Sequence, residues 1–195
     1  MPPLWWCAAV AAAGYLGAIA MGRKGWYKVL PALSLAALVA PSSPLASAAF
    51  VACAAGDAFL LDKERYFLHG LGAFLVGHLL FVPALLMQRS GEPPVWLVVA
   101  IVAAALAVLA AVVPKLRGKL AVAVPIYALA LAVMGIAAGA HGPVATGGAL
   151  LFVVSDGLLA INRFARPLPR AELLILATYF SALLTLAAGI LGAAA

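Results

Sequence analysis

The chain has 195 residues, of which 67% are hydrophobic and only 9% are charged. Soluble domains average roughly a quarter charged residues, so these side chains cannot cover a globule in water, and a soluble protein is excluded. The formal net charge of +6 comes from basic residues scattered between apolar runs, which is typical of membrane topology and argues against nucleic acid as a partner. We therefore expect a membrane protein.

Apolar runs follow one another along the whole chain, and a bilayer core requires about 20 such residues per helix. In chain order we expect transmembrane helices at 4–21, 26–40, 45–61, 66–87, 95–113, 120–138, 144–162 and 171–192. The cations Arg23 and Lys24 follow the first run instead of preceding it, so it is kept as a helix and not taken for a cleavable signal peptide. The sequence predicts an all-α, polytopic bundle of eight transmembrane helices in a single domain, 1–195.

The connections between these helices predict the orientation. Most cations fall after the first, third, fifth and seventh helices: Arg23, Lys24, Lys28, Lys63, Arg65, Lys115, Arg117, Lys119, Arg163, Arg166 and Arg170. The opposite side holds only Arg89. The positive-inside rule then places both termini outside. The Ala-, Gly-, Pro- and Arg-rich composition favours a bacterial inner membrane.

Two acids, Asp57 and Asp156, lie inside apolar runs. An acid in the bilayer costs about 2.5–3.5 kcal/mol on insertion scales, so it usually faces the bundle interior and has a function. The alternative is a structural Asp that locks two helices together by a hydrogen bond. The other acids are expected to be solvated, in a charged turn at 62–65 or at the membrane edge: Asp62, Glu64, Glu92 and Glu172.

Depth along the helices brings further polar residues to the two acids. With a rise of about 1.5 Å per residue, Asp57, Asp156, Tyr127 and Tyr179 lie roughly 6–13 Å below the cytoplasmic boundary. His78 lies deeper, near mid-membrane. This layer predicts a pocket open to the inner leaflet, although both tyrosines also fit an interfacial aromatic belt.

For three further residues, the sequence indicates the environment in the folded protein less clearly. His69 lies one turn into the 66–87 helix, where it faces either the site or lipid headgroups. Ser155 precedes Asp156 and is expected at the site unless it bonds its own helix backbone. His141 falls in the tight turn expected at 139–143 and is predicted to be solvated.

The chemistry of this set leaves alternatives open. His78 and the two Asp could hold a metal ion. Because these are few ligands and their spacing in the sequence is irregular, we expect no metal and no cofactor. A Ser155/His78/Asp57 triad is disfavoured because Ser155 and Asp156 point in different directions on one helix. A faint repeat, residues 56–61 against 155–160, would suit a transporter that uses the two Asp as an ion-coupling pair.

The order of motifs resembles a known family. It runs from Gly56-Asp57 through FLHGLGAFLVGH (67–78) and Tyr127 to GALLFVVSD (148–156) and Tyr179. This pattern resembles the YhhN-type lysoplasmalogenases, eight-helix membrane proteins, over nearly the whole chain. One departure follows Tyr179: the family tends to carry Gln, whereas here Phe180 and Ser181 follow, which puts the headgroup preference in doubt.

The resemblance implies hydrolysis of the vinyl-ether bond of lysoplasmalogens, giving a fatty aldehyde and a glycerophospho-alcohol. Such ethers hydrolyse by acid catalysis, so one Asp would deliver a proton and the other would stabilise the cation or activate water. A lysophospholipid substrate and membrane lipids are the expected partners. The residues expected to bind substrate are His78, Tyr127, Ser155, Tyr179 and His69, with Lys63, Arg65 or Arg163 attracting an anionic headgroup at the rim.

Overall fold

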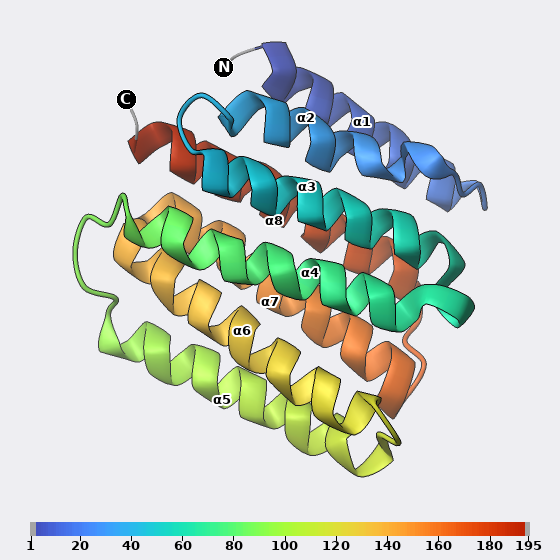
Figure 1. The fold of residues 1–195 in the computed structure, drawn as a ribbon. Coiled ribbons are helices and arrows are strands. Elements are labelled where there is room, and N and C mark those ends of the chain that lie inside the picture. Colours follow the sequence, from blue (N-terminus) through green and yellow to red (C-terminus); the bar gives the residue numbers. More distant parts are fainter. Residues whose placement is uncertain (1–2, 194–195) are drawn as a thin grey trace.

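The computed structural model describes residues 3–193, and this part of the chain is helical apart from short turns and connections (Figure 1). The eight α-helices of this range are α1 (Pro3–Ala20), α2 (Leu30–Val39), α3 (Pro44–Phe59), α4 (Lys63–Leu86), α5 (Val95–Val112), α6 (Leu120–His141), α7 (Pro143–Ala160) and α8 (Ala171–Ala193). Short 3₁₀ segments precede α2 (Trp26–Val29), join α3 to α4 (Leu60–Asp62) and follow α5 (Val113–Lys115). A π-helical turn, Ile161–Ala165, extends α7.

The all-α prediction is confirmed, but the count of membrane spans is not. Leu60–Asp62 joins α3 to α4 with no loop between them, so residues 3–193 form seven helical stretches, one of which holds both α3 and α4 and bends at Tyr66, where the backbone is not helical. Five of these are long and apolar enough to cross a membrane by length and composition, whereas Leu4–Ala20 and Trp26–Val39 are shorter. Eight crossings with both termini outside therefore remain a prediction.

Of two turns expected from the sequence, one is present and the other is shorter than expected. The chain reverses direction near the charged turn expected at 62–65, because α3 and α4 pack side by side with Gly56 against Phe74 and Cys53 against Gly77 (Figure 1). Asp62 caps the N-terminus of α4, accepting a hydrogen bond from the Arg65 backbone N–H at 3.2 Å. α6 continues to His141, so the turn expected at 139–143 shrinks to Gly142. Gly142 has φ +154°, a conformation that favours glycine and ends the helix.

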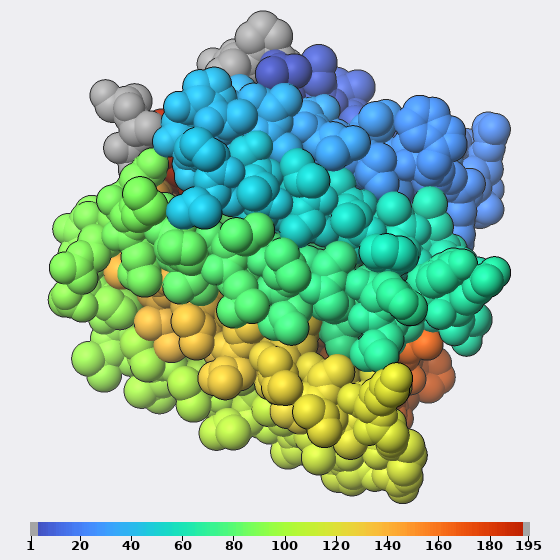
Figure 2. All heavy atoms as spheres, viewed as in Figure 1, coloured from blue at the N-terminus to red at the C-terminus, as the bar shows by residue number. Residues whose placement is uncertain are grey.

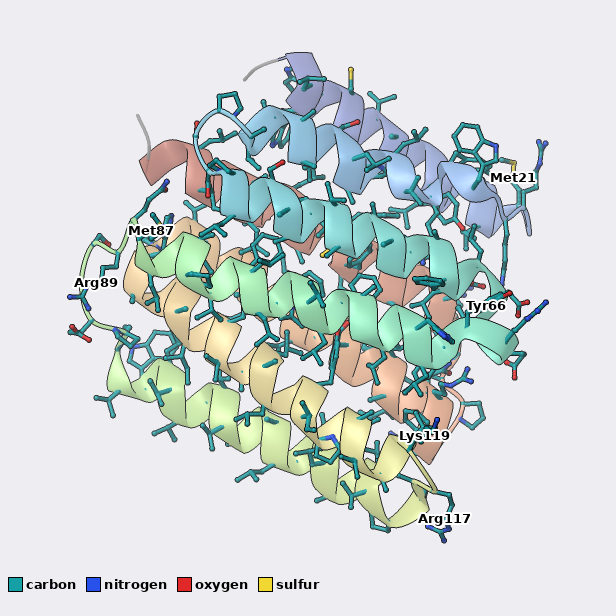
Figure 3. The ribbon with its side chains drawn as sticks, viewed as in Figure 1. Met21, Tyr66, Met87, Arg89, Arg117 and Lys119 are labelled. Atoms are coloured by element: carbon teal, nitrogen blue, oxygen red, sulfur yellow. The ribbon has the colours of Figure 1, made fainter. Side chains whose placement is uncertain are left out.

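The basic connections gather at one end of the bundle. Figure 3 shows Arg117 and Lys119 at the same end as Tyr66, whereas Arg89 and Met87 lie at the opposite end. The helices run approximately along the line between these two ends (Figure 1). This arrangement has the charge asymmetry that the sequence predicts.

One apolar core joins every helix except α5. It is rich in Ala and Phe, and its fully buried members include Phe50, Phe81 and Phe152. α8 packs against α7 and against α1 and α2, while α3 and α4 pair on the face seen in Figure 2. α5 lies at the edge, packed on α6, and buries only Leu97, Ile101 and Val112.

Close packing of α7 on α8 depends on Gly148. A Cβ atom at Gly148 would lie 2.6 Å from the Leu186 backbone N, whereas one at Gly147 would lie 3.9 Å from Thr185 Cγ2, an ordinary contact. We expect Gly148→Ala to destabilise the fold by about 1–3 kcal/mol, because two backbones must separate. The matched control Gly147→Ala is expected to be neutral or slightly stabilising, since Ala favours helix. Thermal unfolding of both detergent-purified variants checks this, and equal unfolding temperatures would contradict it.

Candidate active site

Asp57 lies on α3 in a buried ion pair. Its Oδ1 is 2.9 Å from Lys28 Nζ, and its Oδ2 accepts a hydrogen bond from Tyr179 Oη at 2.7 Å. Lys28 comes from the 3₁₀ segment before α2, and Tyr179 comes from α8. Asp57 is 1% exposed and Lys28 is 6% exposed. Three separate parts of the chain therefore fix this carboxylate in the interior, with its charge compensated by an ammonium group.

The glycine before Asp57 lets α4 approach α3. A Cβ at Gly56 would lie 2.6 Å from the Phe74 ring, so only glycine leaves room for that ring. Phe74 in turn meets the Tyr179 ring edge-on, at a centroid distance of 5.7 Å and an interplanar angle of 90°. The Gly-Asp pair thus places the acid and, through Phe74, supports the tyrosine that binds it.

Asp156, on α7, lies in a second polar cluster. Its Oδ2 accepts a short hydrogen bond from Tyr127 Oη of α6. His78 Nε2 of α4 lies 2.9 Å from the same hydroxyl and 3.6 Å from Asp156 Oδ2. His78 is fully buried, and its ring meets Phe152 edge-on at 4.8 Å. Within residues 3–193 neither Lys nor Arg forms an ion pair with Asp156, which distinguishes it from Asp57.

A single cavity reaches both acids. It contains about 430 Å³ of space between atoms, including the part open to the surroundings. Its polar lining comprises Lys28, Asp57, Tyr127, Ser155, Asp156 and Tyr179, and Phe67, Phe74 and several Leu and Ile side chains complete the wall. The structure therefore collects the two carboxylates and their tyrosine partners around one space, as the depth along the helices predicts.

The other two predicted substrate-binding residues have different surroundings. Ser155 lines the cavity, but its hydroxyl donates to the Ile175 carbonyl of α8 at 3.0 Å and not to its own helix. His69 is exposed and packs against Phe59 and Tyr66. His69 is thus separate from the two acid clusters, and its role remains a prediction.

Lys28 was missed as a site residue. Its position among basic connections indicated a topology signal, yet it is buried against Asp57. The sequence did contain a cue: Lys28 directly precedes the apolar run 29–39, where a charge needs a partner.

His141 is buried and not solvated as expected, whereas Glu172 is partly exposed and forms ion pairs. His141 is 4% exposed, and its Nδ1 and Nε2 lie 3.2 Å from the backbone carbonyls of Leu85 and Gly189, respectively. It is buried because α6 runs on past the expected turn and carries it between α4 and α8. Glu172 pairs with Lys24 at 2.8 Å and Lys63 at 3.2 Å.

The basic residues expected to attract the headgroup at the rim already have partners within the protein. Lys63 pairs with Glu172 at 3.2 Å. Arg163 lies 4.0 Å above the Phe67 ring and 3.8 Å from Glu64, and Arg65 lies 5.0 Å from the Tyr66 ring. In the part of the chain that the structure describes, no three His, Cys, Asp or Glu side chains converge as a metal site.

Comparison with known protein families identifies a family for this chain. The model of the YhhN family matches residues 24–190, a segment that contains both acid clusters and Lys28. The chain belongs to the YhhN family.

Curated relatives of this YhhN chain have been assigned an activity. Human lysoplasmalogenase TMEM86B is 39% identical over 171 residues, which cover 83% of this chain and 73% of the relative. Lysoplasmalogenase TMEM86B of Sus scrofa is 38% identical over 161 residues, covering 80% and 70%. Human lysoplasmalogenase TMEM86A is 35% identical over 159 residues, covering 74% and 64%. No solved structure matches the chain significantly.

Proposed function

We propose that this YhhN protein is a membrane lysoplasmalogenase, which hydrolyses the vinyl-ether bond of lysoplasmalogens to a fatty aldehyde and a glycerophospho-alcohol. Relatives named lysoplasmalogenase support the substrate class. The observation that supports the chemistry is the single cavity lined by two acids with different partners, one buried (Asp57) and one partly buried (Asp156).

The different partners suggest different roles. Lys28 compensates a negative charge on Asp57, so we assign Asp57 the role of a carboxylate that stabilises positive charge in the substrate. Asp156 has no such cation, and the hydrogen bond from Tyr127 engages only Oδ2, which leaves Oδ1 to carry a proton. We therefore assign Asp156 as the general acid, with Tyr127 and His78 as positioning residues.

The reaction needs one proton that is delivered and then recovered. Asp156 protonates the ether's β-carbon, the carbon–carbon double bond is consumed, and an oxocarbenium ion forms at the α-carbon beside the Asp57 carboxylate. Water adds to that carbon and returns a proton to Asp156. The resulting hemiacetal breaks its bond to the glycerol oxygen, which takes the hydroxyl proton, and the aldehyde is released. The sum is substrate plus water to aldehyde plus alcohol, and the acid is regenerated.

The test is aldehyde release from a lysoplasmalogen by the detergent-purified protein, with and without chelator. The matched control is the saturated alkyl-ether lysophospholipid with the same headgroup and chain, which has no double bond to protonate. We expect aldehyde from the vinyl ether alone, unaffected by chelator. If the folded protein released no aldehyde, the proposal would be overturned. If chelator abolished aldehyde release, the reaction would depend on a metal ion and not on acid catalysis by the two Asp.

A further inference from the structure

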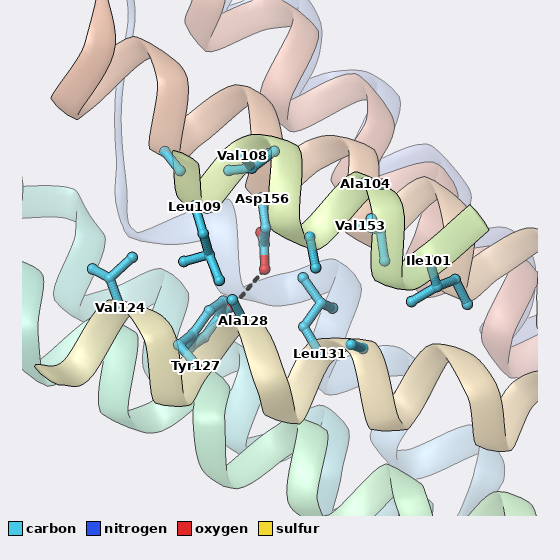
Figure 4. Close-up of a pocket in the computed structure, with 14 residues that line it drawn as sticks. Ile101, Ala104, Val108, Leu109, Val124, Tyr127, Ala128, Leu131, Val153 and Asp156 are labelled. Carbon is cyan, nitrogen blue, oxygen red and sulfur yellow. Dashed lines mark hydrogen bonds between the residues drawn. The ribbon is translucent and has the colours of Figure 1, made fainter. Parts of the chain in front are cut away.

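An apolar groove lies beside Asp156, between α5, α6 and α7 (Figure 4). It contains about 510 Å³ of space between atoms, again including the part open to the surroundings. Figure 4 shows Val108 and Leu109 of α5, Leu131 of α6 and Val153 of α7 around this space, with Asp156 at its edge bonded to Tyr127. Apart from Tyr127 and Asp156, every side chain in its wall is apolar or absent.

The groove adjoins the cavity of the two acids. Tyr127 and Asp156 line both spaces. The cavity in turn shares Lys28 with a third, more polar space, whose wall contains Lys24 and Lys63 together with the acids Asp62, Glu64 and Glu172. From one space to the next, the order is therefore charged side chains of both signs first, the two acids next, and hydrocarbon last.

Two apolar clusters limit the groove along α5. Leu97 and Ile101 pack on Ala132 toward the α5 N-terminus, and Val112 and Leu116 pack on Val124 toward its C-terminus. Between Ile101 and Leu109, the stretch of α5 that lines the groove is about 12 Å long.

We infer that this groove binds the hydrocarbon chain of the lysolipid substrate, with the reacting end at Asp156. The inference rests on the proposed function and adds the direction in which the substrate lies. A single-chain ether phospholipid has its groups in the same order as these spaces: an anionic phosphate, then the ether, then a long apolar chain. The hydrocarbon chain then meets apolar side chains, and the phosphate lies toward Lys24, Lys28 and Lys63. There it competes for these cations with their carboxylate partners, Glu172 and Asp57.

The test narrows the groove without touching the acids. Ala104 and Ala105 of α5 line it, whereas Ala107 of the same helix, exposed like Ala104, does not. We compare Ala104→Leu and Ala105→Leu with the matched control Ala107→Leu, using lysoplasmalogens with a long and a short alkenyl chain. All variants are assayed in one detergent, so that partition of the substrate into the micelle affects the KM of every variant equally.

We expect the groove variants to raise KM for the long-chain substrate about tenfold, the effect of roughly two methylenes losing their contacts. kcat should be retained, because a chain distant from the reacting carbon contributes uniform binding. The short-chain substrate and Ala107→Leu should give wild-type KM values. Wild-type KM in folded groove variants would overturn the inference while leaving the proposed function intact.

A binding measurement separates the two proposals if the wild type releases no aldehyde. The probe is the saturated alkyl-ether lysophospholipid, whose binding requires no chemistry. Weaker binding to Ala105→Leu than to Ala107→Leu would support the groove as a lipid-chain site even though the hydrolase proposal had failed. Equal binding to both would overturn the groove assignment as well.

Discussion

Asp156→Asn is expected to abolish aldehyde release, lowering kcat by about 10²–10⁴-fold, the usual contribution of a general acid. Asn has the same shape and can still accept the Tyr127 hydrogen bond, but it cannot deliver the proton. KM should change little, since the cavity keeps its form. The measurement is steady-state aldehyde release with the unfolding temperature recorded alongside.

Tyr127→Phe provides the matched comparison for Asp156→Asn. It removes the hydroxyl that holds Asp156 but leaves the acid in place. Activity should therefore fall by less than in Asp156→Asn, and the pH dependence of aldehyde release should shift. Full activity in a folded Asp156→Asn variant would reject Asp156 as the proton donor.

Lys28→Met is expected to cause the largest loss of stability, about 3–5 kcal/mol. It removes the ammonium group 2.9 Å from Asp57 and leaves a carboxylate that is 1% exposed without a compensating charge. Breaking one side of a buried ion pair costs more than removing both sides, because the remaining charge has lost its solvent and its partner. Unfolding of the purified variant by heat or denaturant measures this effect.

The double variant Lys28→Met/Asp57→Asn tests whether the loss comes from the unpaired charge. It should recover most of the stability, because no charge is left unpaired, but it should remain inactive without the Asp57 carboxylate. A double variant as unstable as Lys28→Met would show that Lys28 contributes through packing and not through its charge.

The candidate site was predictable from the sequence to the extent that it depends on position along a helix. A rise of about 1.5 Å per residue brings Asp57, Asp156, Tyr127 and Tyr179 to one level, and all four line one cavity. Which tyrosine binds which acid depends on the order of helices around the bundle. Tyr127 reaches Asp156 because α6 packs on α7, and Tyr179 reaches Asp57 across α3 and α8.

The two buried residues that the sequence did not predict, Lys28 and His141, have a common physical explanation. Lys28 and His141 were judged from their neighbours in the chain, where each borders a polar connection. Their burial is decided by segments far away: Lys28 meets Asp57, and His141 lies between Leu85 and Gly189.

The connection between α4 and α5, residues 87–94, is exposed at its centre, where the side chains of Arg89 and Glu92 are 64% and 85% accessible. It is also the boundary between the two acids along the chain. A cut there would leave Asp57, Lys28 and His78 on one fragment, and Asp156, Tyr127 and Tyr179 on the other. The proposed catalytic centre is thus formed between two halves of the chain, and neither half alone carries both acids.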